Sequence, residues 1–194
     1  MRSARRAAGS PESDAEFAPL IGAARSGEEW ALTVLYRRFQ PTLLGYLRGQ
    51  AGPSEAEDLA SEVWIDVARA LPRFEGSEAG FKSLVFTVAW RRLTDHRRRA
   101  GHRRTDPVPE ERLADRAGRD DPEHSAVSAI AGQDAIARLR SLLSPEQAQV
   151  IMLRVLADLP VEEVAAIMGK RAGAIRSLQH RAILRLAEEL SEDA

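Results

Sequence analysis

The sequence predicts an all-α protein in which a flexible linker joins two small helical bundles. Apolar residues recur at steps of three and four along several stretches, and no stretch alternates as a β-strand would. Aromatic residues are only 5% of the 194 residues, too few for a β-sandwich or barrel rich in aromatic strands. Between the helical stretches lies a charged segment with few large apolar residues, which contains Gly101, Pro107, Pro109, Gly118 and Pro122.

The composition excludes several kinds of site. The chain has no cysteine, so disulfides and thiolate metal sites are excluded, and its four histidines show no metal-ligand spacing. No apolar run approaches the roughly 20 residues of a transmembrane helix. No apolar segment follows the basic N-terminus as in a secretory signal. We therefore expect a cytoplasmic protein with no metal, no cofactor and no membrane insertion.

The first bundle is expected over residues 16–100, after a disordered tail at 1–15 that has mixed charge and no periodicity. Its first long helix carries one apolar stripe, made of Leu32, Leu35, Phe39, Leu43 and Leu47. The segment from Gly49 to Pro53 ends this helix.

Ser54 and Glu57 fit a capping box at the start of a second helix, which Pro72 ends. Its apolar residues repeat every four positions, at Leu59, Val63, Val67 and Leu71. After a glycine-containing loop at 73–80, a third helix is expected from Phe81 to about Arg99.

The net charge of −1 conceals a basic block followed by an acidic one. From Arg91 to Arg104 there are seven arginines and two histidines against one acid. From Asp106 to Glu123 there are seven acids against three arginines. The acidic block belongs to the predicted linker at 101–127, and the basic block ends the third helix.

The second bundle is expected over residues 128–190. Ser144 is a predicted N-cap with Pro145 as the first helical residue. The helix that follows has its apolar face at Val150, Ile151, Leu153 and Leu156.

A helix-turn-helix motif ends the second bundle. A short helix at 161–168, a turn at Gly169-Lys170-Arg171 and a longer helix from Ala172 to about Glu189 have the required order and length. The second helix of such a motif enters the DNA major groove. The predicted DNA-contacting residues are Lys170, Arg171, Arg176, Ser177, His180, Arg181 and Arg185. A plain solvated helix face usually mixes both signs, whereas residues 170–185 contain no acid.

Three motifs of the first bundle are similar to region 2 of the extracytoplasmic-function (ECF) sigma factors of the sigma-70 family. They are Glu57-Asp58-Leu59-Ala60-Ser61-Glu62-Val63-Trp64, Ala70-Leu71-Pro72-Arg73-Phe74, and the segment from Phe81-Lys82-Ser83-Leu84 to Asp95-His96-Arg97-Arg98. The segment from Ser144-Pro145-Glu146-Gln147 to Arg181-Ala182 resembles region 4 of the same family. Both occur in family order with no separate region 3 between them.

The resemblance implies a factor that binds core RNA polymerase and directs initiation at promoter DNA. Region 2 would dock on the β′ coiled coil and read and melt the −10 element, whereas region 4 would contact the β flap and read the −35 element. The implied polymerase-binding residues are Asp58, Glu62, Trp64 and Asp66. The residues alone are equally compatible with other interpretations. The acids could form an ordinary solvated helix face, and Trp64 could be an ordinary core residue. An anti-sigma factor is a further candidate partner.

The −10 element would be held by an aromatic and cationic surface, as single-stranded DNA commonly is. The implied residues are Arg73, Phe74, Trp90, Arg91, Arg97 and Arg98. The basic block would follow the phosphate backbone. For Phe81 we expect a core position, and for Phe74 base capture and bundle packing both stay open.

The chain departs from the family pattern at three places. Leu84 stands where tryptophan is common, the segment Ala89-Trp90-Arg91-Arg92 lacks the usual asparagine, and the recognition helix reads Arg176-Ser177-Leu178-Gln179-His180-Arg181. Promoter preference is therefore not transferred from the family.

Three other functions fit the sequence less well. A stand-alone helix-turn-helix operator-binding regulator would be a dimer on paired half-sites, and the region 2 motifs argue against it. An enzyme is disfavoured because the chain has no Gly-rich phosphate loop and no nucleophile beside a base. An anti-sigma or other binding module would not need two basic DNA-contacting surfaces.

Overall fold

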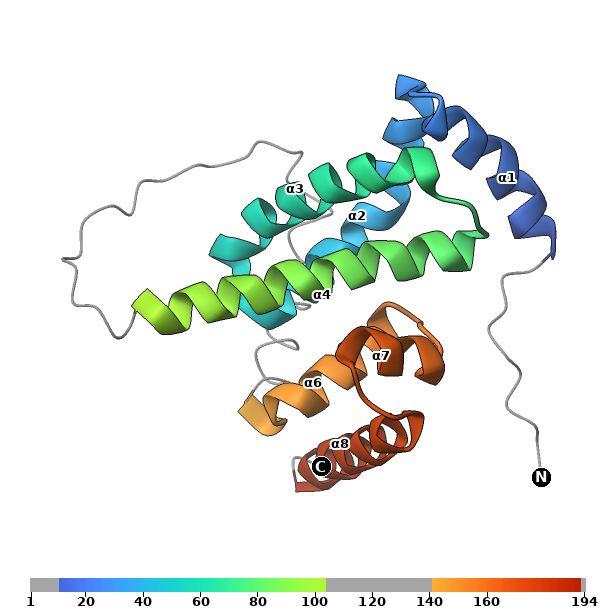
Figure 1. Cartoon of the computed structure of the whole chain (residues 1–194). Coiled ribbons are helices and arrows are strands. Elements are labelled where there is room, and N and C mark those ends of the chain that lie inside the picture. Colours follow the sequence, from blue (N-terminus) through green and yellow to red (C-terminus); the bar gives the residue numbers. More distant parts are fainter. Residues whose placement is uncertain (1–10, 104–140, 193–194) are drawn as a thin grey trace, which may run out of the picture.

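A computed structural model describes residues 11–103 and 141–192, and within these ranges all regular structure is helical (Figure 1). The predicted all-α class is confirmed. Most of the predicted linker at 101–127, and the predicted helical start near residue 128, lie outside the described residues. The helix before the linker continues to Arg103, three residues beyond the predicted bundle.

The N-terminal bundle begins with α1 (Pro11–Arg25) and α2 (Glu29–Ala51). α1 includes residues 11–15, which the sequence analysis assigned to the tail. Proline suits the first turn of a helix, and Phe17 and Leu20, both buried, hold α1 against the bundle. The first residues of α1 are mostly polar and show no apolar periodicity. The start of the helix was therefore predicted too late in the sequence.

The predicted apolar stripe of α2 is buried at Leu35, Phe39, Leu43 and Leu47. Leu32 is an exception because it is 36% exposed. It lies at the edge of the stripe and lines an apolar groove between α2 and α3.

α3 (Pro53–Ala70) buries Leu59, Val63 and Val67 as predicted, and a short 3-10 turn, η1 (Leu71–Arg73), follows it. The predicted capping box at Ser54 is wrong, because α3 has no side-chain cap and Gly52 is its N-cap. Pro53 is favoured as the first helical residue. The helix therefore starts two residues earlier than a Ser54 cap would place it, and Ser54 already lies inside it.

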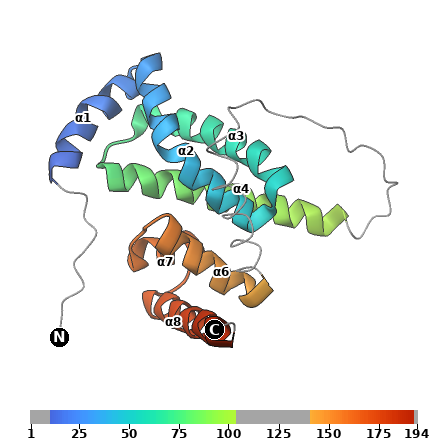
Figure 2. The same cartoon turned by 180° about the vertical axis from the view of Figure 1, so that it is seen from behind.

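α4 (Glu78–Arg103) is the longest described helix and packs against α2 and α3 (Figures 1 and 2). Its buried side comprises Phe81, Val85, Phe86, Val88, Ala89 and Leu93. Leu84 is half-buried at the edge of that side. The second half of α4 carries the exposed arginines of the basic block.

The C-terminal bundle contains α6 (Pro145–Ile151), a π-helical turn η2 (Met152–Leu156), α7 (Val161–Met168) and α8 (Ala172–Glu192). The predicted Ser144 cap is confirmed as a capping box. The Gln147 backbone N–H donates to Ser144 Oγ over 3.3 Å, and the Ser144 N–H donates to Gln147 Oε1 over 2.9 Å. Val150, Ile151 and Leu153 are buried, but Leu156, predicted on the same face, is 42% exposed because the π-helical turn changes the register.

The two bundles lie against each other. α7 packs on α4 and η2 packs on α2, and in both views the C-terminal bundle lies beside α4 (Figures 1 and 2). Buried residues of both bundles form one continuous hydrophobic cluster. The sequence predicted two bundles, and their packing together is a finding of the tertiary structure.

Candidate nucleic-acid interface

The helix-turn-helix geometry is present in the C-terminal bundle. Gly169 closes α7 in a left-handed conformation, with φ of +63°, which glycine adopts without a Cβ penalty. Ile175 and Ala182 of α8 are fully buried and Leu178 is 8% exposed, so that α8 is fixed against α6 and α7. The opposite side of α8 is thereby directed to solvent.

Six of the seven predicted DNA-contacting residues are exposed: Arg176, Ser177, His180, Arg181 and Arg185 on α8, and Arg171 in the turn just before it. Arg176 donates to Glu162 Oε1 over 3.0 Å. Both of these side chains are mostly exposed, and a surface ion pair of this kind contributes little. Glu162 therefore holds Arg176 only weakly.

Lys170 differs from the other six residues. It is half-buried, and its Nζ lies 2.8 Å from Glu146 Oε1 at the start of α6. This ion pair joins the turn to α6. The structure thus gives Lys170 a role inside the bundle that the sequence did not indicate.

Arg154 connects the π-helical turn to α8. Its Nε donates to Gln179 Oε1 over 3.2 Å, and its Nη1 donates to the carbonyl of Leu159. These bonds help to set the position of α8 relative to α7. Sequence reasoning missed Arg154, because no spacing relates it to a glutamine in another helix.

The predicted −10 residues lie in succession along α4 and do not form one cluster. Arg73 is exposed in η1, and Phe74 is half-buried just before α4. The Phe74 ring meets Phe81 edge-on, with 5.6 Å between centroids. Phe81 is fully buried, which confirms its predicted core position.

Trp90 and Arg91 lie farther along the same helix. Nine residues of α-helix separate Phe81 from Trp90, or roughly 13 Å at about 1.5 Å per residue, so that Trp90 is not directly beside Phe74. Trp90 is half-buried against the core and Arg91 is exposed. Arg97 and Arg98 are exposed nearer to the C-terminal end of α4.

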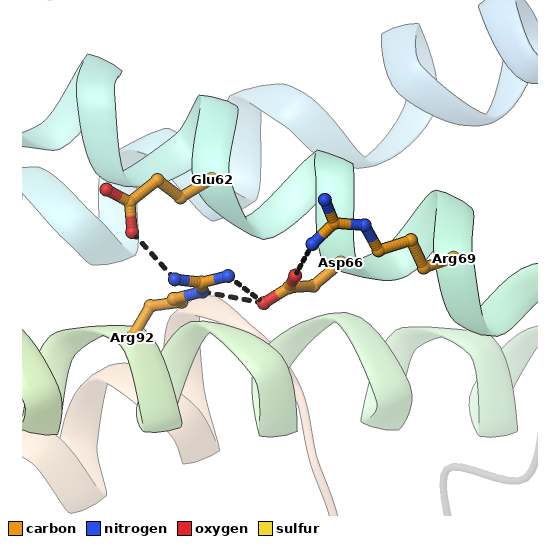
Figure 3. A network of polar contacts seen from close by, with 4 residues as sticks. All are labelled: Glu62, Asp66, Arg69 and Arg92. Atoms are coloured by element: carbon orange, nitrogen blue, oxygen red, sulfur yellow. Dashed lines mark hydrogen bonds and ion pairs between the residues drawn. The ribbon is translucent and has the colours of Figure 1, made fainter.

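The acidic residues of α3 belong partly to a network within the bundle (Figure 3). Arg92 of α4 donates from Nη1 to Glu62 Oε2 over 3.0 Å and from Nε to Asp66 Oδ2 over 2.6 Å. The hydrogen bond that Arg92 donates to Asp66 is the main cause that raises the pKa of Arg92. Arg69 also reaches Asp66, over 3.3 Å. Among the described residues no ion pair involves Asp58, which is exposed.

Trp64 lies beside an apolar patch that the sequence analysis did not identify. Its indole N–H donates to Gln40 Oε1 over 2.7 Å, and its ring lies 5.2 Å from the ring of Tyr36. The two rings border a groove of about 310 Å³ between α2 and α3. Tyr36 is 45% exposed and Ile65 is 51% exposed. Partly exposed aromatic and aliphatic residues beside a groove are typical of a protein-binding surface.

Replacement of Arg92 by alanine should destabilise the N-terminal bundle. Glu62 and Asp66 would lose their shared cation, and hydrogen bonds to charged groups at partly exposed positions contribute about 1–2 kcal/mol. A loss of this size lowers the melting temperature by about 4–8 °C or more. Arg91→Ala is the matched control, since Arg91 is the exposed neighbour in α4. Thermal denaturation of both variants measures the difference, and equal melting temperatures would contradict the structural role of Arg92.

Within residues 11–103 and 141–192 there is no group of three histidine, aspartate or glutamate side chains placed to hold a metal ion. None of the described helices is long and apolar enough to cross a membrane. The described helices present three surfaces: a cationic helix face, a basic helix with aromatic residues near it, and an acidic helix beside an apolar groove.

A helix-turn-helix bundle packed on a second helical bundle with these surfaces defines a two-domain DNA-binding protein. The Sigma-70 region 2 family matches residues 35–103, and the Sigma-70, region 4 family matches residues 141–188. The chain is 33% identical over 182 residues to the ECF RNA polymerase sigma factor SigD of Mycobacterium tuberculosis, covering 88% of this chain and 82% of SigD.

Two solved structures share the fold. CnrH, in complex with the cytosolic domain of CnrY, superposes with a TM-score of 0.63 at 19% identity, over 91% of this chain and 97% of CnrH. The sigma factor RpoE of Bartonella quintana, in a complex with the anti-sigma factor NepR, gives a TM-score of 0.57 at 23% identity, over 93% of this chain and 97% of RpoE.

The chain belongs to the sigma-70 family, as an ECF RNA polymerase sigma factor. A sigma factor binds core RNA polymerase and directs transcription initiation at promoters. The resemblance found in the motifs of the sequence is thereby confirmed.

Proposed function

We propose that α8 reads the −35 element through the side chains of its exposed face. The observation that carries this proposal is the gathering of three arginines, one histidine and one serine on the solvent side of a helix whose other side is fixed by Ile175, Leu178 and Ala182, with Arg171 exposed just before it. Arginine forks onto guanine or phosphate, whereas serine and histidine make single contacts. Lys170, which pairs with Glu146, contributes a phosphate contact at the turn.

The −10 element is read along α4 and the loop before it. Arg73 and Phe74 lie at the N-terminal end of α4, Trp90 and Arg91 at its middle, and the pair Arg97–Arg98 beyond them. A strand of DNA that follows the helix meets the aromatic residues first and the arginines at its upstream end. Phe74 must leave its edge-on contact with Phe81 before a base can stack on it.

Core RNA polymerase binds the surface formed by α3 and the adjoining part of α2. Asp58 offers an exposed carboxylate, and Glu62 and Asp66 are held in place by Arg92. Trp64 and Tyr36 add an apolar centre to this acidic surface. We propose the β′ coiled coil as the partner of this surface and the β flap as the partner of the C-terminal bundle.

The functional division follows the predicted domains. The first runs over 16–100 and is extended by α1 to Pro11 and by α4 to Arg103, the rest of the predicted linker at 101–127 follows, and the second runs over 128–190. The protein acts in the cytoplasm, on RNA polymerase, and is not itself an enzyme. An anti-sigma factor is a proposed partner, since the sigma factor RpoE of the same fold is found in a complex with one.

Reconstituted transcription tests the proposal. Promoter fragments are first recovered from the genome by chromatin immunoprecipitation with the chain. The purified chain and core polymerase should then give specific transcripts from these fragments, and neither component alone should do so. Failure to bind core polymerase would refute the proposal. Tight duplex binding by a dimer without polymerase would instead support an operator-binding regulator.

A further inference from the structure

Helix α1 packs on both elements that flank the loop of residues 74–77, η1 before it and α4 after it (Figures 1 and 2). Asp14 Oδ1 of α1 accepts a hydrogen bond from the backbone N–H of Glu78 over 3.4 Å. Glu78 is the first residue of α4, and the first N–H groups of a helix find no acceptor within that helix. A carboxylate from α1 therefore fixes the point at which the loop becomes α4.

Arg38 of α2 holds the side chain of the same glutamate. Its Nη2 lies 2.6 Å from Glu78 Oε1 and 2.7 Å from Glu78 Oε2. Hydrogen bonds between charged groups are about twice as strong as those between neutral groups. The Glu78 side chain is only 17% exposed, so water screens this ion pair less than it screens a surface pair. Glu78 is thus held by α1 through its backbone and by α2 through its carboxylate.

The loop also makes contacts within itself and with the first turn of α4. The Gly80 N–H donates to Ser77 Oγ over 3.3 Å, and the Phe81 N–H donates to the carbonyl of Ser77 over 2.9 Å. A Cβ atom at Gly76 would lie 3.0 Å from Cζ of Phe74, so that the ring lies directly on the backbone of the loop. The position of the Phe74 ring therefore depends on the conformation of the loop.

Phe81 joins the loop to the same two helices through apolar contacts. The Phe74 ring lies 5.6 Å from the Phe81 ring, edge-on. Phe81 also contacts Phe17 of α1 over 5.9 Å and Phe39 of α2 over 5.2 Å, measured between ring centroids. Phe17, Phe39 and Phe81 are all buried. The apolar contacts therefore agree with the polar ones, because both connect the loop to α1 and to α2.

Both ends of the loop are fixed in the free chain. At the first end, the Phe74 N–H donates to the carbonyl of the buried residue Leu71 over 3.0 Å. At the second end, Glu78 is held by Asp14 and Arg38. A segment that is already ordered loses less conformational entropy when it binds a ligand. A −10 base should therefore bind more tightly to this loop than to a loop that is free at its Glu78 end.

We infer that Arg38 and Asp14 are positioning residues for the loop that receives the −10 base, so that α1 belongs to the −10-reading part of the protein. Both residues act through Glu78, and neither touches the DNA. The backbone of the loop keeps its conformation, and only the Phe74 side chain turns toward the base. This inference rests on the proposed function, in which a base of the −10 element stacks on Phe74.

The test uses single-stranded oligonucleotides that carry the −10 element of a promoter recovered by chromatin immunoprecipitation. One is intact, and in each of the others an abasic site replaces one base. The complex of wild-type chain and core polymerase should bind the intact oligonucleotide about 5- to 150-fold more tightly than the one that lacks the captured base, because a base stacked on an aromatic ring contributes that much. Arg38→Ala should weaken binding to the intact oligonucleotide by about three- to tenfold. Its binding to the abasic oligonucleotide should be nearly unchanged.

Matched variants identify the cause of the loss. Arg38→Lys keeps a cation opposite Glu78 and should restore most of the affinity. Asp14→Ala should cause a smaller loss, of about two- to threefold. Asp14→Asn should restore the affinity, because its amide oxygen can still accept the Glu78 N–H. Arg37→Ala, at the exposed neighbour of Arg38, should bind both oligonucleotides as the wild type does.

Two results of the binding experiment would overturn the inference. If Arg38→Ala weakens binding to intact and abasic oligonucleotides alike, and the dependence on salt becomes shallower, Arg38 contacts a phosphate and does not position the loop. Wild-type affinity of Arg38→Ala for the intact oligonucleotide would also overturn it. If Arg38→Ala fails to bind core polymerase as well, the variant has not folded, and the comparison of Asp14→Ala with Asp14→Asn decides in the same way.

Hydrogen exchange of the free chain separates a failure of this inference from a failure of the proposed function. The amides of residues 78–81 should exchange faster in Arg38→Ala than in the wild type, because this end of the loop is released, whereas those of α3 should be unchanged. Unchanged exchange at residues 78–81 would overturn the positioning role. Faster exchange, together with a wild-type complex that binds every abasic oligonucleotide as tightly as the intact one, would instead refute the proposed reading of the −10 element, and the inference would fall with it.

Discussion

Replacement of Arg176 or Arg181 by alanine should weaken binding to the −35 element by about 5- to 150-fold each, because a base-reading arginine contributes about 1–3 kcal/mol. Both side chains lie on the exposed face of α8, and neither contributes to the buried side. The loss should appear in the affinity of the polymerase complex for a promoter fragment and in transcript yield. Melting of the free protein should be nearly unchanged, since surface substitutions usually alter stability by less than about 0.5 kcal/mol.

Two controls separate base reading from general electrostatics. On a fragment with a scrambled −35 element the penalty of each substitution should largely disappear. Arg98→Ala, on α4, should instead weaken binding to both fragments alike and make the dependence on salt shallower. Unchanged transcription with Arg176 and Arg181 both replaced would reject the assignment of α8 as the recognition helix.

Replacement of Tyr36 by alanine should weaken binding to core RNA polymerase by about 30-fold, because an aromatic centre of an interface commonly contributes about 2 kcal/mol or more. Tyr36 is 45% exposed, its ring contacts Trp64, and it borders the groove beside the acidic residues of α3. The exposed part of the Tyr36 ring would then be buried by the partner. Binding of labelled chain to core polymerase measures the effect.

The controls again use matched positions. Tyr36→Phe keeps the ring and should bind core polymerase nearly as the wild type does. Asp58→Ala, at the exposed acid of the same surface, should show a smaller loss that shrinks as salt is added, because exposed charges are screened. Wild-type affinity of Tyr36→Ala would place the polymerase-binding surface elsewhere on the bundle.

The helices were predicted well where the apolar period is strong. The repeat of Leu59, Val63 and Val67 determines which side of α3 is buried, since residues four apart lie on one face of a helix. The ends of the helices were predicted correctly in some places and wrongly in others. The capping box was correct at Ser144 and wrong at Ser54. Both serines stand next to a proline, but Pro145 follows its serine whereas Pro53 precedes Ser54, and proline at the first helical position decides which residue is the cap.

The sequence predicted which candidate site residues lie on exposed helix faces. It did not predict which side chains they pair with. Sequence spacing placed Glu62 and Asp66 on one stripe of α3, but the partner of both is Arg92, which lies 30 and 26 residues away and was counted only as part of a basic block. The apolar groove at Tyr36 was missed for a similar reason. An exposed aromatic residue has no local signal that distinguishes it from a core residue.

The sequence by itself determined the all-α class, the family resemblance and the helix-turn-helix, because helical period, turns and motifs are properties of neighbouring residues. Only the tertiary structure decided that the two bundles pack together through Tyr46 and Gln149, which are 103 residues apart. Glutamine is usually found at the surface, and the apolar period of the helix does not predict that Gln149 is buried. Its burial depends on hydrogen bonds to the Tyr46 hydroxyl and the Arg97 guanidinium, which lie in the other bundle. Contacts between residues so far apart in the sequence leave no local pattern from which they could be predicted.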